Sequence, residues 1–422
     1  MNKIKTITLE NGLQIIINKN KKNTTKAQIF IKAGGLDTNF KIDNKEIEVP
    51  LGTAHFLEHY LLEQSIYGNA NKIFSDEYVT SNGITSYYTT EFYIKTVHDF
   101  EENFIKLLNI VNNPDFNKNI EEVKNPIIQE IKRSNDREAK LYYKTLFESI
   151  TKNKMYDTTL GEIETIKNMD INTIKTFHET LYNPNNQIIL LTGNIKENIV
   201  DIIKDFYKNK TNKNVERKKL IEQDQIINKR NEIVDKTINE NVFEITYKVN
   251  VKKYTPLEKN KIDYYLHYLF DIKYNEQSEL FDYMIKNKLT LYTIETHLDP
   301  SVLKGYMLIT LKSYTSEFKK VIELLQKEFN TDNLTEENFK KYRNKMIIQK
   351  ICDLENDIYV TSNYINNVLL YDLHEYDSVE FIKSLKLDEC KKMLNELDYS
   401  NYTILINKEK DNRTGLINFY MK

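Results

Sequence analysis

The segment GTAHFLEHYLLEQSI, residues 52–66, has apolar residues at helical spacing, and strand-like segments lie on both sides of it. Before it, KTITLENGLQIIINKN (5–20) predicts two short strands around an Asn-Gly turn, and KAQIFIKAGG (26–35) predicts a third strand. After it, SNGITSYYTTEFYIKTV (81–97) has the β-branched and aromatic residues typical of strands. Thr53 is available as the helix N-cap. We expect a helix packed on a sheet.

Helical segments and one further strand complete the first half of the chain. HDFEENFIKLLNIVNN (98–113) and PIIQEIKRSNDREAKLYYKTLFESI (126–150) are amphipathic, and the second places Pro126 in its first turn. NPNNQIILLTGNI (183–195) predicts a turn followed by a buried strand. The order of strands, helix, strand, helices and strand predicts an α+β fold in which an antiparallel sheet is covered by helices.

The chain is long enough for two domains. Its 422 residues exceed what one hydrophobic core usually supports. Residues 209–236 are highly charged with few apolar anchors, so we expect a linker there between a first domain, 1–208, and a second, 237–422. The order of strand-like and helical segments recurs in outline after the linker. This predicts two homologous halves, although they share no readable motif.

Composition excludes several classes of protein. Sixty Lys and Arg against 62 Asp and Glu leave a net charge of -2, which argues against a nucleic-acid binder. No stretch approaches about 18 uninterrupted apolar residues, and residues 1–14 lack the apolar run of a signal peptide. Cys352 and Cys390 are isolated, which is typical of reduced thiols. We expect a soluble cytoplasmic protein without a membrane or nucleic-acid partner.

The chemistry is concentrated in one pentad, His55-Phe56-Leu57-Glu58-His59, which is the inverted zinc motif H-x-x-E-H. On a helix, positions 55 and 59 lie one above the other, so both imidazoles can reach one ion, with Glu58 beside it. A further protein oxygen would leave a fourth position for water, whose proton a carboxylate can accept. The composition of this chain would give only about 0.02 such pentads by chance. The alternative interpretation is two surface histidines on an amphipathic helix. The pentad predicts metal-assisted hydrolysis of a carbonyl.

A third ligand must come from elsewhere in the chain. The acidic candidates are Glu121, Glu122, Glu130 and Glu138. We prefer Glu130, because isoleucines on both sides of it predict that this part of the helix packs inward, where a carboxylate needs a metal or a cation. The other three are interpreted as solvated charges.

Five segments together resemble the pitrilysin or insulinase-type zinc peptidases, which include the mitochondrial processing peptidases. Over roughly residues 5–196 the resemblance rests, in order, on LENGLQI (9–15), GTAHFLEHYL (52–61), SNGITSYYTTEFY (81–93), IIQEI (127–131) and LYNPNNQIILLTGNI (181–195). It implies a clam shell of two homologous halves, each a sheet covered by helices. The length looks closest to the short bacterial members that work as paired subunits.

The resemblance also implies roles for particular residues. The implied Zn²⁺ ligands are His55, His59 and Glu130, and the implied general base is Glu58. The implied edge strand, on which a peptide is laid, contains Asn82, Gly83, Ile84 and Thr85.

The sequence departs from the family pattern in three places. One is Asn82-Gly83 instead of Asn-Ala, a small change that keeps close backbone approach possible. Val123 and Lys124 stand where the family often has a Glu-Arg pair, so a second carboxylate near the metal is in doubt. In the second half, Tyr292 matches a carbonyl-gripping tyrosine, but Ile285 stands where its arginine partner would be. Since Ile cannot donate to an oxyanion, either Tyr292 acts alone or another chain supplies the donors. The alternative role of Tyr292 is ordinary half-buried packing. We therefore expect a second subunit of the same family in a heterodimer, or a homodimer.

Two functions follow from these residues. The first is a zinc-dependent endopeptidase that hydrolyses short or unfolded peptides held as an added strand, in peptide maturation or disposal. The alternative is a non-catalytic binding or scaffold subunit of a two-chain peptidase. The complete set of His55, Glu58, His59 and Glu130 favours the first.

Overall fold

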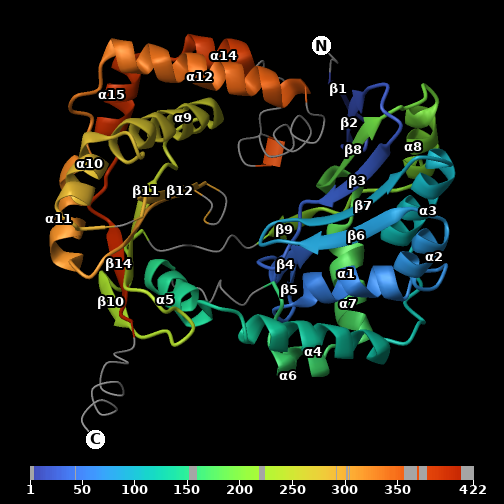
Figure 1. Ribbon diagram of the computed structural model, residues 1–422. Coiled ribbons are helices and arrows are strands. Elements are labelled where there is room, and N and C mark those ends of the chain that lie inside the picture. The colour runs from blue at the N-terminus through green and yellow to red at the C-terminus, as the bar shows by residue number, and fades with distance from the viewer. Residues whose placement is uncertain are drawn as a thin grey trace, which may run out of the picture. The chain divides into compact units, whose positions relative to one another are not determined.

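The computed structural model divides the chain into two units, each containing a sheet and helices (Figure 1). Unit 1 contains Met1–Asp136 and Met155–Ile221, and unit 2 contains Arg137–Lys154 and Glu222–Lys422. Within these limits the structure describes residues 4–42, 44–151, 159–217, 224–290, 292–300, 303, 305–355, 368–369 and 378–409. The predicted α+β class with two sheet-containing halves is confirmed.

Unit 1 is built on a six-stranded sheet in the order β1-β2-β8-β3-β7-β6. Its strands are β1 (Lys5–Thr8), β2 (Gln14–Lys19), β3 (Thr25–Ile31), β6 (Thr80–Thr85), β7 (Thr90–Thr96) and β8 (Gln187–Gly193). The strands predicted within 5–20, 26–35 and 183–195 are present, and 81–97 folds as the hairpin of β6 and β7. The sheet is not purely antiparallel, because β2 and β8 pair in parallel.

The helices of unit 1 pack mainly on the large sheet and on one another (Figure 1). They are α1 (Thr53–Glu63), α2 (Ala70–Asp76), α3 (Phe100–Asn112), α4 (Glu121–Asn135), α6 (Ile163–Lys167), α7 (Ile171–Leu181) and α8 (Ile199–Tyr207). A small second sheet contains β4 (Asn39–Ile42), β5 (Lys45–Glu48) and β9 (Val215–Arg217). The core lies between the large sheet and the helices, where the inward side chains of both are fully buried.

Three helix boundaries differ from the prediction. The N-cap of α1 is Gly52, with φ of 88°, a left-handed conformation that suits glycine. Thr53 is instead the first helical residue, and its hydroxyl donates to the carbonyl of Pro50 at 2.7 Å. The helix predicted over 126–150 is two helices, with a break where Ala139 has φ of 59°. Pro126 lies inside α4, because that helix begins five residues earlier than predicted.

Unit 2 has a five-stranded sheet in the order β10-β14-β11-β13-β12. Its strands are β10 (Arg230–Ile233), β11 (Val242–Asn250), β12 (Glu295–Asp299), β13 (Tyr306–Tyr314) and β14 (Tyr402–Asn407). Its helices include α5 (Lys140–Ile150), α9 (Pro256–Lys273), α10 (Glu279–Lys286), α11 (Phe318–Glu328), α12 (Glu336–Glu355), α14 (Ser378–Ser384) and α15 (Leu387–Asn395). Its buried core is separate from that of unit 1.

The two large sheets share one strand order. In unit 1, setting aside β1, the first strand β2 pairs in parallel with the last strand β8, which pairs antiparallel with the second strand β3. In unit 2, β10, β14 and β11 are related in the same way. The third and fourth strands of each unit then follow as an antiparallel pair. This agreement supports the predicted duplication.

The segment expected to be a linker, 209–236, contributes strands to both units. β9 pairs with β4 in unit 1, where Arg217 donates to the side chain of Asn186 at 2.6 Å. β10 pairs with β14 in unit 2. Four of the charged residues in this segment, Glu216, Arg217, Arg230 and Glu232, therefore belong to short edge strands. In the parts of the chain described above, no helix is both long and apolar enough to cross a membrane.

Helix α5 packs on the sheet of unit 2, although it precedes the predicted boundary at 208. Tyr142 and Leu146 are buried against Val242 and Leu405. The fully buried ammonium of Lys248 donates to the carbonyl of Ile150, the last residue of α5, at 2.7 Å. Apolar packing and a helix cap thus hold α5 on this sheet.

Candidate metal centre

The pentad lies on α1, which is buried on nearly all sides. Phe56 and Leu57 have no exposed surface, and α1 contacts β6, α4 and α7 (Figure 1). The hydroxyl of Tyr60 donates to the carbonyl of Asp115 at 2.8 Å and ties α1 to the loop before α4. The helix that carries the pentad is therefore fixed against several neighbouring elements.

Helix α4 presents Glu130 to the pentad. Val123, Ile127 and Ile131 recur at four-residue spacing, are buried, and form the side of α4 that packs inward. Glu130 precedes Ile131 at the border of this stripe, and a third of its side-chain surface is exposed. The reasoning from neighbouring isoleucines thus located a carboxylate at the pentad. The other three candidates, Glu121, Glu122 and Glu138, are exposed.

Three side chains converge with the spacing of a metal site. Nε2 of His55 and Nε2 of His59 each lie 3.5 Å from Oε2 of Glu130. A tetrahedral ion with bonds of about 2.0–2.2 Å separates its donor atoms by about 3.3–3.6 Å, so these distances fit zinc. Within the described residues, this is the one group of three or more His, Cys, Asp or Glu side chains that could hold an ion together. The donor set, two imidazoles and one carboxylate, also suits zinc.

The charges of the protein without metal are set by burial and by the neighbouring carboxylates. Burial, reinforced by His59, lowers the pKa of His55 to about 4. Burial also acts to lower the pKa of His59, but its contacts with Glu130 and Glu63 outweigh this and raise that pKa to about 9. The contact with His59 lowers the pKa of Glu130. Without metal, the protonated ring of His59 therefore provides the positive charge beside Glu130 that a divalent cation would otherwise provide.

Glu58 lies beside the three donors and faces the edge strand β6. Its side chain is buried, and Oε2 accepts a hydrogen bond from the Thr85 hydroxyl at 2.9 Å. A methyl group on Gly83 would lie 2.3 Å from Oε1 of Glu58, so a larger residue there would displace the carboxylate from this position. Burial raises the pKa of Glu58 to about 7. A carboxyl group with this pKa can both accept and release a proton near neutrality.

Glu63 completes the surroundings of the metal ligands and was missed in the sequence. Its Oε1 lies 2.8 Å from Nδ1 of His59, the ring nitrogen that faces away from Glu130. Such a carboxylate orients a metal-binding imidazole and raises its basicity. The available signal was its position, one helical turn after His59. Glu63 therefore places a second carboxylate beside the three donors, whereas Lys124 pairs with Glu121.

The remaining predicted site residues lie on β6 or in unit 2. Asn82 and Ile84 alternate with Gly83 and are exposed on the opposite side of β6 from Glu58. Tyr292, in unit 2, is half exposed and packs its ring at 5.3 Å from that of Tyr314. Ile285, on α10, is also exposed. Both residues lie in unit 2, whereas His55, His59 and Glu130 lie in unit 1.

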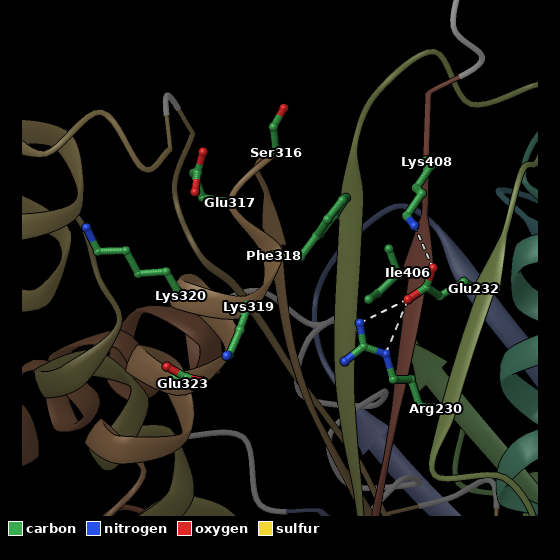
Figure 2. Close-up of a pocket in the computed structure, with 10 residues that line it drawn as sticks. All are labelled: Arg230, Glu232, Ser316, Glu317, Phe318, Lys319, Lys320, Glu323, Ile406 and Lys408. Carbon is green, nitrogen blue, oxygen red and sulfur yellow. Dashed lines mark hydrogen bonds and ion pairs between the residues drawn. The ribbon is translucent and has the colours of Figure 1, made fainter.

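Unit 2 has a hollow of about 460 Å³ at the N-terminus of α11 (Figure 2). Arg230 and Lys408 reach it from β10 and from the end of β14, but both bind Glu232, at 2.9 and 2.6 Å. Figure 2 shows these two ion pairs side by side. Because the charges satisfy one another, we do not include this hollow in the site.

Comparison with protein families identifies the chain. Residues 14–164 match the model of the insulinase family, peptidase family M16, and residues 168–346 match that of the M16 inactive domain. The chain belongs to peptidase family M16. The first match includes His55, His59 and Glu130, so the possible metal site lies in the half that is not of the inactive type.

Two curated relatives of this M16 chain are named zinc proteases. It is 27% identical over 234 residues to YmfH of Bacillus subtilis (strain 168), described as an uncharacterized zinc protease. It is 26% identical over 205 residues to the zinc protease PqqE of Helicobacter pylori (strain ATCC 700392 / 26695). These matches cover 53% and 46% of this chain, and 54% and 44% of the relatives, so the chain spans about half the length of each.

Solved structures share the fold of this M16 chain. A structure described as an M16-like peptidase from Alicyclobacillus acidocaldarius superposes with a TM-score of 0.84 at 17% identity, over 96% of this chain and 98% of the other. Pitrilysin superposes with a TM-score of 0.74 at 17% identity, over 97% of this chain but 45% of its own. The periplasmic protease PqqL of Escherichia coli, with a TM-score of 0.78 at 15% identity, is matched over 98% of this chain and 48% of its own.

Proposed function

We propose that this chain is a zinc-dependent endopeptidase that hydrolyses short or unfolded peptides. The observation that carries the proposal is the convergence of His55, His59 and Glu130 at zinc spacing, with the buried carboxylate of Glu58 beside them. The names of the two curated relatives support zinc as the metal. Bound to these three donors, zinc would polarise the scissile carbonyl and favour ionisation of the attacking water.

The protein side chains divide the remaining work. Glu58 accepts the proton of the attacking water and then delivers it to the leaving amine, for which its position beside the three donors suits it. His55, His59 and Glu130 hold the metal, and Glu63 orients the His59 ring. Because Glu58 is buried, its proton transfers occur where bulk water is largely excluded.

Strand β6 offers a place for the peptide. It forms one edge of the six-stranded sheet, and its only strand partner among the described residues is β7. An extended peptide can add to such an edge through main-chain hydrogen bonds, which tolerate varied side chains. Gly83 and Thr85 face Glu58 from this strand, so a peptide laid along β6 would pass close to the general base.

Elemental analysis and peptide cleavage test the proposal together. We expect about one zinc per chain in the wild type, and loss of zinc in His55→Ala and His59→Ala. Glu58→Gln should keep zinc but lose about 10²- to 10⁴-fold in cleavage of a pool of unstructured peptides, because an amide cannot take the proton. Glu130→Gln should weaken zinc retention, whereas Glu122→Gln on the same helix serves as the matched control. Wild-type cleavage by Glu58→Gln would contradict the mechanism.

We further propose that a second subunit, either a family member or another copy, completes the enzyme. In pitrilysin and PqqL, the region matching this chain is about half of a longer polypeptide. Ile285 cannot donate to an oxyanion, and loss of one such donor typically costs about 10²- to 10³-fold in rate. Cleavage should therefore appear or rise sharply when a second M16 chain is added, and Ile285→Arg should raise the activity of the chain alone. A fully active isolated monomer would contradict this expectation.

The alternative function is a non-catalytic binding or scaffold subunit. The match of residues 168–346 to the inactive-domain model favours it, but that match does not include His55, Glu58, His59 or Glu130. The two functions differ in one result. The Glu58→Gln chain is mixed with its partner, and zinc content and cleavage are measured. If this chain binds zinc and the mixture still cleaves at the wild-type rate, catalysis resides in the partner.

A further inference from the structure

The carboxylate of Glu58 is held between α1 and β6 by two residues of the strand. Thr85 donates its hydroxyl proton to Oε2, at 2.9 Å. Gly83, two residues earlier and on the same side of β6, leaves room for Oε1, which would lie 2.3 Å from any β-carbon at that position. The Cγ atom of Glu58 would lie only 2.8 Å from the same β-carbon. One strand thus bounds the carboxylate along its length and binds one of its oxygens.

We propose that Thr85 is a positioning residue that acts through Glu58, and that its side chain does not serve to bind the peptide. This inference rests on the proposed peptidase function. The resemblance to the family assigned the whole segment Asn82–Thr85 to the peptide, but the side chains alternate across the strand. Asn82 and Ile84 are exposed on one side, whereas the Thr85 hydroxyl is engaged by Glu58 on the other.

The hydrogen bond matters because Glu58 has several rotamers available and the reaction needs one. A glutamate side chain loses substantial rotamer freedom when it is fixed, and a hydroxyl donor reduces the number of orientations open to it. A displacement of about 1 Å at a reacting group can cost about 10²-fold in rate. In this arrangement β6 has two tasks, since the strand proposed to bind the peptide also orients the Glu58 carboxylate.

The test compares Thr85→Val with Thr85→Ser. Valine keeps the shape and strand propensity of threonine but removes the hydroxyl, whereas serine keeps the hydroxyl. Thr192→Val, on β8 of the same sheet, is the matched control, because the Thr192 hydroxyl is buried without a hydrogen-bond partner among the described residues. Three quantities are measured for each variant. They are the zinc content, kcat and KM for one unstructured peptide, and the affinity of the zinc-free protein for a fluorescent peptide.

We expect kcat of Thr85→Val to fall about 10- to 100-fold, with zinc content, KM and peptide affinity within about twofold of wild type. Thr85→Ser should recover most of kcat, and Thr192→Val should match the wild type. A rise in KM and weaker peptide binding at unchanged kcat would overturn the inference and assign the Thr85 side chain to the peptide. Wild-type kcat in Thr85→Val would overturn it as well.

A crystal structure of Thr85→Val separates this inference from the proposed function. If Thr85 positions the carboxylate, Glu58 should adopt a different rotamer or several conformers in that variant. A single Glu58 conformer unchanged from the wild type would overturn the inference, whatever the protein cleaves. If the wild type binds zinc and cleaves no peptide with or without a partner, the proposed function fails, and the rotamer of Glu58 still decides the role of Thr85.

Discussion

The stability of unit 1 should fall on mild acidification because of one buried histidine. His178 lies on α7, which packs against α1, the helix that carries the pentad. Its Nε2 donates to the carbonyl of Val111 at 2.8 Å, and its ring packs on Tyr182 and Phe116. Burial lowers the pKa of His178 to about 4, with Lys210 adding to the effect and the Val111 hydrogen bond opposing it. The folded protein therefore keeps His178 neutral well below pH 6.

The sign and size of the effect follow from linkage. Between pH 6.5 and pH 4 the unfolded chain binds a proton on His178 and the folded chain does not, so the free energy of unfolding falls as pH falls. Well above pH 6.5 His178 is neutral in both states, so it does not reduce the free energy of unfolding there. Pure linkage with pKa values of about 6.5 and 4 gives a loss of about 2 kcal/mol between pH 7.5 and pH 5.

A matched variant isolates this contribution from other titrating groups. His178→Gln retains an amide donor for the Val111 carbonyl but does not titrate. Urea unfolding of both proteins, followed by circular dichroism with a chelator present, is measured at pH 7.5 and at pH 5. The wild type should lose about 2 kcal/mol more than the variant between these values, and any constant cost of the substitution cancels. Parallel losses, equal within about 0.5 kcal/mol, would refute the assignment of a neutral buried His178.

Two further predictions concern a neighbour of the metal donors and the backbone after α2. Glu63→Gln should lower zinc affinity about 10- to 100-fold in a competition assay with a chelator, because the amide orients His59 less strongly, and unchanged affinity would exclude that role. Tyr78, 88% exposed with φ of 56° directly after α2, occupies a left-handed position that favours glycine, so Tyr78→Gly should raise the free energy of unfolding by about 1 kcal/mol while Tyr78→Ala should not. Equal unfolding midpoints for the two Tyr78 variants in urea would count against backbone strain there.

The strands and the metal donors were predictable because their signals are local. Alternating or continuous apolar runs located β2, β3 and β8, and the pentad needed only helical periodicity to bring His55 and His59 together. The inward position of Glu130 was predictable from the isoleucines around it, because residues next to a buried helix face lie close to the protein interior. The cytoplasmic location stays a prediction.

Other features depended on the backbone or on distant contacts. The start of α1 at Gly52 and the break before α5 at Ala139 require left-handed dihedral angles, which residue type suggests for glycine and does not suggest for alanine. The hydrogen bond from Thr85 to Glu58 joins residues 27 positions apart, and only the packing of β6 on α1 brings them together. The family pattern named both residues without indicating that they touch.

The placement of α5 decides how the gene can be divided. A single cut near residue 208, at the apparent boundary, would leave the N-terminal fragment with an amphipathic helix whose apolar side has lost its cover. The C-terminal fragment would expose Val242 and Leu405 and would leave the ammonium of Lys248 without its acceptor on Ile150. An exposed apolar patch promotes misfolding and aggregation. A soluble N-terminal fragment would therefore require removal of α5 as well as the cut.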